Sequence, residues 1–558
     1  MAGFWTALLL LAILGHAAGQ GVYLGCYVDH EDDRDFPYVV TWSDLTPPKC
    51  IRHCADMGFG YAGLQYAVEC FCGNHYGTHG QAPESDCNHA CAGGGDYTCG
   101  SGWRNSVWST GAAVLTEDQL DLVFEDNFDS LDFSKWRPEV TAGGGGNEEF
   151  QTYVNLPENL YTRNGTLFLK PTLAAERLGE KFLTEGVINL REDALYLGCY
   201  HDGGSMDSRD LNGDNMTSPY LTPKLCLDHC TEAGYTYAGL QYGTECFCGD
   251  SFGKFGAAPE SECAIPCGGD AGQMCGNGWK NSIYTSVGGT CTLENWNGCY
   301  IAGSPSQHLP PVLSARLTTA HSFSFRYGKV EVTAKMPTGD WIWPAIWLLP
   351  QTWVYGDWPR SGEIDIVETR GNRDLYASWG ASLGIDVTTS TLHWGSSGVW
   401  PYNGFFKTRA EKEAHTGTYG SDFHKWTMVW TDQYLKFFVD DELMLTVSPP
   451  NGFWALGDFG LPDSDNPWSG AGRMAPFDQD FYLIMNVATG GTNGFFMDDY
   501  VNMPHPKPWA NAQSRSEAMA SFWRARDQWL PTWNPAHNNG EDAAMQVKSV
   551  KVWKFRDL

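Results

Sequence analysis

The chain reads Ser361-Gly-Glu363-Ile-Asp365-Ile-Val-Glu368, shortly after Trp358-Pro359. Side chains alternate between the two faces of a β-strand, so Glu363 and Asp365 share one face and the two isoleucines share the other. Strict alternation would turn the next residue, Val367, to the acidic face. One extra residue, as in a β-bulge, instead returns Glu368 to that face. The stretch therefore predicts a bulged strand with three carboxylates on one side and an apolar opposite side.

Three clustered carboxylates repel one another and do not help folding, so the cluster favours a chemical role. The alternative is an exposed edge strand with its charges in solvent. The Trp-rich segment 340–347 and the apolar opposite side favour the floor of a cleft. Retaining glycoside hydrolysis uses two carboxyls about 5–5.5 Å apart. In such a site Glu363 would attack the sugar, Glu368 would act as acid and base, and Asp365 would hydrogen-bond Glu363 and assist.

A second feature is an internal repeat, with copies at 22–110 and 195–286. The run Tyr-Leu-Gly-Cys-Tyr at 23–27 recurs at 196–200, and seven cysteines recur with a displacement of 176 residues. Eight cysteines in about 90 residues predict four disulfides per copy, with the pairing open among 105 possibilities. Zinc binding through Cys50-x3-Cys54 and Cys70-x-Cys72 is the alternative.

Strand-like runs lie on both sides of the second copy. Residues 115–193 and 289–558 together have a suitable length for one large β-sandwich, so the second copy is predicted to be inserted in it. Cys291 and Cys299 would close a small loop just after the insertion.

The bulged acidic signature resembles that of glycoside hydrolase family 16, whose fold is a curved β-jelly roll. Further stretches resemble laminarinases and β-1,3-glucan-recognition proteins of that family: 142–151, 314–317, 323–332, 339–350 and 481–491. The cysteine pattern resembles the WSC domain, a carbohydrate-binding module. We therefore expect an all-β protein, with a jelly-roll sandwich and two small disulfide-rich WSC-like modules. Either module could equally be a spacer.

The resemblance also implies roles for residues outside the acidic strand. Asn147 and Arg316 would hydrogen-bond sugar hydroxyls, Trp343 and Trp358 would stack on or flank sugar rings, and His393 would lie near the reacting unit. Each of these has a structural alternative, because a Trp in a sandwich is more often core and His393 could serve packing alone.

Members of the family often bind a structural calcium through an acid near the C-terminus. This chain has Val547-Lys548-Ser549-Val550 there, and a lysine would repel the ion. Glu125 and Asp126 would fit the other half of such a site. We therefore expect no metal and no cofactor.

The formal net charge of −30 disfavours nucleic acid and anionic lipid as partners and favours neutral ligands. Residues 1–19 carry a short apolar run followed by small residues, which predicts a signal peptide. A buried strand or a membrane anchor is the alternative. Eighteen cysteines and possible glycan acceptors at Asn164 and Asn215 agree with export. We expect a secreted protein without a membrane anchor.

The sequence thus predicts a secreted retaining endo-β-1,3-glucanase, with β-1,3-glucan as its partner. A non-catalytic glucan-recognition lectin is the first alternative, and a hydrolase or transglycosylase for another polysaccharide is the second. Retention of all three acids favours catalysis. The oligomeric state, the biological role and the tolerance for branched glucan stay open.

Overall fold

The computed structural model describes residues 21–31, 33–111, 119–190, 194–205, 208–286 and 298–556. The predicted signal peptide, 1–19, and Cys291 lie outside these residues; Cys299 is disulfide-bonded. Among the helices of the described residues, none has the length and apolar character needed to cross a bilayer.

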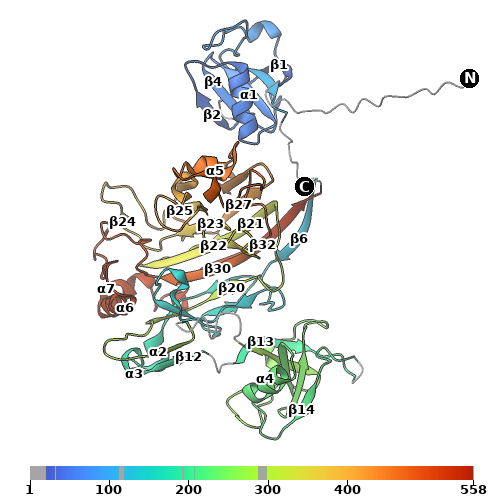
Figure 1. Cartoon of the computed structure of the whole chain (residues 1–558), viewed down its shortest axis with the longest axis vertical. Helices are drawn as coiled ribbons and strands as arrows, with labels where there is room; N and C mark the ends of the chain where they lie inside the picture. The colour runs from blue at the N-terminus through green and yellow to red at the C-terminus, as the bar shows by residue number, and fades with distance from the viewer. Residues whose placement is uncertain are drawn as a thin grey trace, which may run out of the picture.

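The centre of the molecule is a sandwich of two large antiparallel sheets (Figure 1). The sheet that carries the acids, here called the cleft sheet, has the order β26 (Arg409–Glu413), β25 (Val387–His393), β23 (Glu363–Thr369), β22 (Ile342–Pro350), β30 (Phe481–Thr489), β20 (Arg316–Thr318), β7 (Arg137–Pro138). The other, the back sheet, has the order β29 (Glu442–Val447), β28 (Leu435–Val439), β27 (His424–Trp430), β21 (Gly328–Lys335), β32 (Met545–Phe555), β10 (Leu167–Leu169), β9 (Leu160–Thr162), with β6 (Leu120–Asp126) also paired to β32.

The core lies between the two sheets and follows the two-residue period of the strands. In β21 every second residue is buried, and Val330 and Val332 are fully enclosed. Ile346 and Leu348 of β22 are enclosed from the other side, together with Trp426 and other large side chains. Because most inward positions are apolar, with Thr388 and Ser390 of β25 as polar exceptions, the sequence specifies a sandwich, and the all-β prediction is confirmed.

Short elements complete the sandwich at its ends. The strands are β8 (Gln151–Tyr153), β11 (Thr172–Leu173), β19 (Val312–Ser314), β12 (Val187–Asn189), β18 (Tyr300–Ala302), β24 (Leu375–Tyr376) and β31 (Val501–Asn502). The helices are α2 (Ala174–Leu178), α3 (Phe182–Glu185), α5 (Gly452–Gly457), α6 (Arg515–Arg524) and α7 (Arg526–Trp529). Helix α6 begins with a capping box, in which Ser514 and Glu517 satisfy each other's backbone N–H groups.

The two repeat copies are separate small modules at opposite ends of the sandwich (Figure 1). Each is a five-stranded sheet with one helix. The first contains β1 (Tyr23–Val28), β2 (Tyr38–Thr41), α1 (Pro47–Asp56), β3 (Tyr61–Gln65), β4 (Glu69–Gly73) and β5 (Arg104–Ser109). The second contains β13 (Ala194–His201), β14 (Asn215–Thr217), α4 (Pro223–Glu232), β15 (Tyr237–Gln241), β16 (Glu245–Gly249) and β17 (Lys280–Ser286).

Four disulfides form in each module, with the same pairing in both. They are Cys26–Cys87, Cys50–Cys70, Cys54–Cys72 and Cys91–Cys99, and Cys199–Cys263, Cys226–Cys246, Cys230–Cys248 and Cys267–Cys275. The disulfide prediction is therefore confirmed. Since these sulfur atoms are all bonded, they supply no thiolate to zinc, and that alternative is wrong.

Both modules contact the sandwich. Strand β12, which precedes the second module, pairs with β18, which follows it, so the two ends of the inserted module leave the sandwich side by side. Arg137 donates to the hydroxyl of Tyr237, and Tyr200 packs in the same apolar cluster as Phe133. The first module contacts the β28–β29 hairpin of the back sheet, where Leu443 packs against the module's core.

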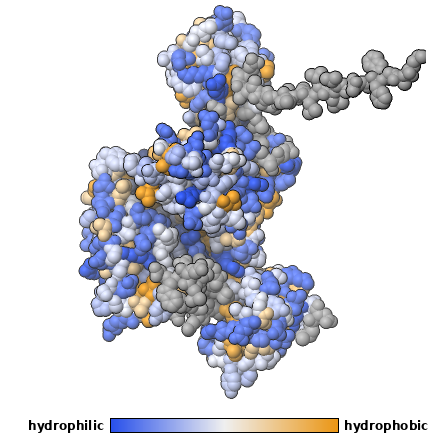
Figure 2. Space-filling model, in the orientation of Figure 1, coloured by the Kyte–Doolittle hydropathy of each residue, from blue (hydrophilic) through white to orange (hydrophobic). Residues whose placement is uncertain are grey.

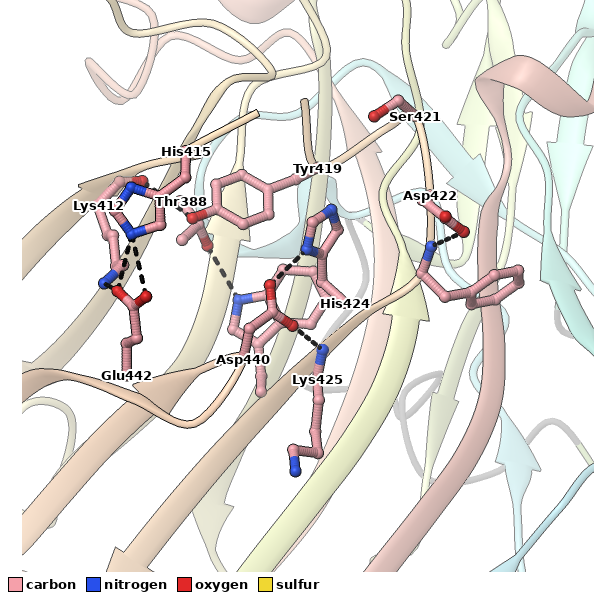
Figure 3. A network of polar contacts seen from close by, with 12 residues as sticks. Thr388, Lys412, His415, Tyr419, Ser421, Asp422, His424, Lys425, Asp440 and Glu442 are labelled. Atoms are coloured by element: carbon pink, nitrogen blue, oxygen red, sulfur yellow. Dashed lines mark hydrogen bonds and ion pairs between the residues drawn. The ribbon is translucent and has the colours of Figure 1, made fainter. Parts of the chain in front are cut away.

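The β28–β29 hairpin is connected to the cleft sheet by a polar network (Figure 3). Glu442 forms ion pairs with Lys412 and His415, which belong to β26 and the loop after it. Asp440, at the turn, accepts from the backbone N–H of Lys425 and contacts His424. These contacts hold one edge of the sandwich closed. On the face seen in Figure 2, hydrophilic residues dominate and hydrophobic residues are scattered, in agreement with the net charge of −30.

Candidate active site

The acidic stretch forms β23, and the predicted bulge is present. Its register against β25 shifts between Asp365 and Glu368, and its register against β22 shifts at the same place. Ile364 and Ile366 are enclosed in the core, and so is Val367. The bulge therefore places Val367 inward and leaves all three acids on the face of the sheet that points away from the core, as predicted from the sequence.

Glu363 and Asp365 form one half of the site, together with a histidine and a tryptophan. The indole N–H of Trp358 donates to Glu363 Oε2 at 2.8 Å. His393 is the cross-strand neighbour of Glu363, and its Nε2 lies 3.2 Å from Asp365 Oδ2 and 4.0 Å from Glu363 Oε1. The ring of Phe405 stacks on His393 and fixes its plane. His393 thus lies within reach of both acids.

Glu368 forms the other half of the site. The indole N–H of Trp343 donates to Glu368 Oε1 at 2.9 Å. Trp343 is only 7% exposed, because Phe495 stacks on its ring with centroids 3.8 Å apart. The guanidinium of Arg370 lies over the ring of Phe495, 4.1 Å from its centroid, and donates to the carbonyl of Phe495. Trp343 therefore offers little free ring surface, and its clear contact is with the acid.

Burial and mutual repulsion shift the acids of β23. Burial first, then the charges of Asp365 and Glu368, raise the pKa of Glu363 to about 8, against the opposing effect of His393 and the Trp358 hydrogen bond. Burial and the charge of Glu368 raise the pKa of Asp365 as well. Asp365 is the more enclosed of the two, and it is hydrogen-bonded to Glu363. At neutral pH the two carboxyls therefore share a proton, and Glu363 becomes the attacking carboxylate when that proton leaves.

Arg316 lies in the same row of the cleft sheet as Glu368. The register runs from Arg316 to Asn486, then to Ala345 and to Glu368, across four neighbouring strands. Three strand spacings amount to about 14 Å. Arg316 is 9% exposed and its Nε lies 2.7 Å from Glu139 Oε2. It is brought to the cleft sheet, but its guanidinium is already paired.

Asn147 belongs to a hydrogen-bonded chain of polar side chains. Its amide donates to Glu149 and accepts from Asn493. Glu149 is buried and also accepts from Gln151 and from the hydroxyl of Tyr153. Tyr153 in turn accepts from the amide of Asn486, whose oxygen accepts from the indole of Trp347. The chain links the 142–151 loop to the centre of the sheet.

Several residues of the site were not identified from the sequence: Glu149, Tyr153, Arg370, Phe405, Asn486 and Phe495. They come from distant strands and loops, which only the folded sandwich brings together. Trp379 and Trp400, which are the most exposed tryptophans among the described residues, were also missed. Trp400 lies two residues after Gly398, and a methyl group placed on Gly398 would lie 2.7 Å from the ring of Trp358. An unpaired Trp in a Gly- and Ser-rich loop is the signal that could have found it.

The residues expected to face a calcium ion do not fit one. The carboxylate of Glu125 pairs with Lys551 at 3.2 Å, and Lys135 Nζ donates to the backbone oxygen of Glu125 at 2.9 Å. Both carboxylate oxygens of Asp126 accept from N–H groups. Lys548, the lysine expected to repel the ion, instead lies over the ring of Phe423. Elsewhere in the described residues, Glu363, Asp365 and His393 have metal-ligand atoms within 4.8 Å of one another, but they belong to the acid cluster.

Comparison with known proteins identifies two kinds of family domain. The WSC domain model matches residues 23–101 and 196–277, and the model of glycosyl hydrolases family 16 matches 296–454. A β-1,3-glucan-binding protein of Penaeus monodon is 41% identical over 435 residues, which cover 78% of this chain and 90% of that protein. The glucan endo-1,3-beta-glucosidase A1 of Niallia circulans is 37% identical over 179 residues, which cover 32% of this chain and 22% of that protein.

The laminarinase of Rhodothermus marinus is a solved structure with a similar chain path. It has 20% identity and a TM-score of 0.38, and the match covers 78% of this chain and 98% of that one. The Penaeus protein matches most of this chain. The family models match the region of the acidic strand and both cysteine-rich modules. The chain belongs to glycosyl hydrolases family 16 and carries two WSC domains.

Proposed function

We propose that this chain is a secreted retaining endo-β-1,3-glucanase. One observation carries the proposal: the acids at the two ends of the bulged cluster, Glu363 and Glu368, are each held by an indole N–H, from Trp358 and from Trp343. A scaffold role would not require two ordered carboxyls on one side of a strand. Export is proposed because disulfides persist in oxidising compartments and the first 19 residues have the pattern of a signal peptide.

The substrate class follows from the relatives. The Penaeus protein is named for binding β-1,3-glucan, and the Niallia protein for cleaving it. A neutral glucan also suits a chain with a net charge of −30, which would repel sulfated polymers.

In the proposed reaction, Glu363 carries the negative charge and attacks the anomeric carbon. Glu368 gives its proton to the glycosidic oxygen, so that the leaving sugar departs as an alcohol and a covalent glycosyl-enzyme forms. Glu368 then takes a proton from water, whose oxygen attacks the same carbon and releases Glu363. Asp365 shares a hydrogen bond with Glu363, and its charge raises the pKa of Glu363, so it tunes the nucleophile.

A second candidate is a non-catalytic β-1,3-glucan lectin. The observation that favours it is the name of the Penaeus protein, which matches most of this chain. The two candidates share a ligand and differ in one event, the cleavage of the polymer.

The deciding experiment is product analysis of the purified chain on laminarin, with mixed-linkage glucan, agarose and carrageenan in parallel. Release of oligosaccharides from laminarin, with β-anomers as the first products by NMR, is the expected result. Glu363→Gln should abolish release and keep binding. Glu413→Gln, which changes an exposed acid of β26, is the matched control and should keep full activity. Binding to laminarin without cleavage by the unaltered chain would establish the lectin.

A further inference from the structure

A pocket separate from the acid cluster lies in the segment that joins β29 to β30. Its volume is about 350 Å³, which is at the lower end of the range for small-molecule sites. Helix α5, labelled in Figure 1, contributes to its lining. Aromatic, acidic, amide and hydroxyl side chains line the pocket, among them Phe453, Trp454, Asp463, Asn466, Trp468 and Ser469. None of them takes part in the proposed reaction.

The floor of the pocket is an aromatic cluster. Phe453 and Trp468 are buried, and both rings pack on Trp394, with ring centroids 4.9 Å and 6.2 Å from it. Trp394 is fully enclosed, and its indole N–H donates to the hydroxyl of Thr408. Trp454 is only partly buried and lies edge-on to Trp468, with centroids 6.4 Å apart. The apolar surface is therefore ordered before a ligand arrives, which lowers the entropy cost of binding.

Two polar side chains of the pocket each use one atom to hold its wall. Asp463 Oδ1 accepts from the indole N–H of Trp454 at 3.2 Å. Asn466 Oδ1 accepts from the backbone N–H of Trp468 at 2.9 Å. The second atoms, Asp463 Oδ2 and Asn466 Nδ2, make no hydrogen bond with the part of the chain that the structure describes. The pocket therefore offers a ligand one fixed acceptor and one fixed donor beside an indole ring.

These groups suit a neutral sugar. A sugar hydroxyl can donate to Asp463 while another accepts from Asn466, and an apolar C–H face can contact the ring of Trp454. The carboxylate and the net charge of −30 disfavour an anion. A bound cation is disfavoured as well. Among the residues that the structure describes, metal-ligating side chains converge in threes at the acid cluster and at two disulfide clusters, and not at the pocket.

The floor of the pocket is connected to the loops around the acids. The indole N–H of Trp468 donates at 2.7 Å to the carbonyl of Arg360, which precedes Glu363 by three residues. Arg360 Nε in turn donates at 2.9 Å to the carbonyl of Ser396, in the loop that follows His393. The two loops that lead to Glu363 and away from His393 therefore lie beside the pocket.

We propose that this pocket is a second carbohydrate site, which binds one or two neutral sugar units of a polymer that also enters the cleft. The identity of that polymer as β-1,3-glucan rests on the proposed function. A polymer held at the pocket stays close to the acids, so its effective concentration at the cleft rises without any new contact in the cleft itself.

The test measures hydrogen–deuterium exchange of residues 451–475 by mass spectrometry. It uses the full chain with Glu363→Gln, which prevents cleavage, and laminaritriose, a β-1,3-linked glucose trisaccharide, as the probe. A sugar in the pocket restricts local opening of this segment, so exchange of its backbone N–H groups should slow when laminaritriose is added.

Two pairs of variants separate the pocket from the cleft. Ser469→Trp should fill the pocket and abolish the protection. Ser464→Trp should keep it, because Ser464 is exposed on the same segment and does not line the pocket. Asp463→Asn keeps the acceptor for Trp454 but replaces the other, charged oxygen by an amide. It should raise the sugar concentration for half-maximal protection about tenfold, and Asp465→Asn, outside the pocket lining, should leave it unchanged.

Three outcomes overturn the proposal. Exchange of residues 451–475 could be the same with and without the sugar, protection could survive Ser469→Trp and so come from the cleft, or calcium chloride could protect the segment in place of the sugar. Cleavage of laminarin by the chain with an intact Glu363 is measured separately. Cleavage without protection would overturn the pocket alone, whereas protection without cleavage would contradict the proposed function and leave the pocket standing.

Discussion

The ammonium of Lys436 in the back sheet lies 3.8 Å from the ring centroid of Phe59 in the first WSC domain. It also donates to the carbonyl of Gly58 at 3.3 Å and lies 4.6 Å from the ring centroid of Tyr434. Lys436 is buried on the β28–β29 hairpin, which the Figure 3 network connects to the cleft sheet. One lysine therefore lies enclosed at the junction of two domains.

The docking of the first domain should depend on pH. Burial lowers the pKa of Lys436 to about 7, whereas an exposed lysine titrates near 10.4. Between these values the undocked chain holds a proton that the docked chain has lost, so docking strengthens as pH rises through this window. Below pH 7 both states are protonated and docking stays at its weakest. Small-angle X-ray scattering should show a larger fraction of compact molecules at pH 9.5 than at pH 7.

Lys436→Met should abolish this dependence, because the replacement fills the same space without a proton to lose. Lys425→Met, on the neighbouring strand β27, is the control, since Lys425 pairs with Asp441 at the hairpin surface. Equal compactness of the unaltered chain at both pH values would show that Lys436 does not govern docking.

Glu363→Gln should stabilise the fold at neutral and alkaline pH. Burial and the neighbouring charges raise the pKa of Glu363 from 4.5 to about 8. Between these values the folded chain holds a proton that the unfolded chain has released, so stability is lost as pH rises through this window. Removing the carboxyl should raise the free energy of unfolding by on the order of 2 kcal/mol at pH 8 and by little at pH 4.5. Thermal melts of this variant and of Glu413→Gln at both pH values provide the measurement; a gain independent of pH would contradict the assignment.

Two substitutions beside Glu363 should shift the acidic limb of the pH profile of kcat/KM in opposite directions. The charge of Asp365 raises the pKa of Glu363, and the hydrogen bond from Trp358 lowers it. Asp365→Asn removes the charge, so the limb should move to lower pH. Trp358→Phe removes the N–H donor and keeps a ring, so the limb should move to higher pH. The measurement is the pH profile of kcat/KM on laminarin for both variants. Shifts of the same sign would show that the ionisation of Glu363 does not set the acidic limb of this profile.

Removal of calcium should leave the chain unaffected. Lys551 and Lys135 already supply positive charge to the carboxylate and carbonyl of Glu125. Excess chelator should therefore leave the thermal midpoint unchanged, and added calcium should not raise it. A calcium-dependent increase would mean that these lysines move aside and that the oxygens of Glu125 and Asp126 accept the ion.

Local pattern was enough to predict the bulged strand. Glu363 and Asp365 alternate with Ile364 and Ile366, which fixes the two faces of the strand. Glu368 joins the acidic face when a bulge adds one residue before it. The count of cysteines likewise predicted four bridges per module. Their pairing could not follow from spacing, because loops of 8 to 64 residues all close with acceptable geometry once the sheet has formed.

The surroundings of the acids could not be predicted in the same way. Phe495 covers Trp343 from a segment far along the chain, and Arg316 lies in one row with Glu368 only because four strands adopt one register. Registers depend on pairing between distant strands, which a single sequence does not reveal. The same limitation applies to Arg316: its residue type suits a sugar contact, but its pairing with Glu139 is a property of the folded sheet.

Arg316 should therefore act mainly through stability. Arg316→Met would leave Glu139, and the buried Glu149 that its charge also favours, without a cationic partner. Breaking a buried pair in this way costs about 3–5 kcal/mol. The double variant Arg316→Met with Glu139→Gln should recover part of that loss, because the unpaired charge of Glu139 is then removed while Glu149 remains. Chemical denaturation of both variants, with laminarin KM measured where they fold, separates the roles: a stable Arg316→Met chain with a raised KM would make Arg316 a sugar ligand and not a scaffold residue.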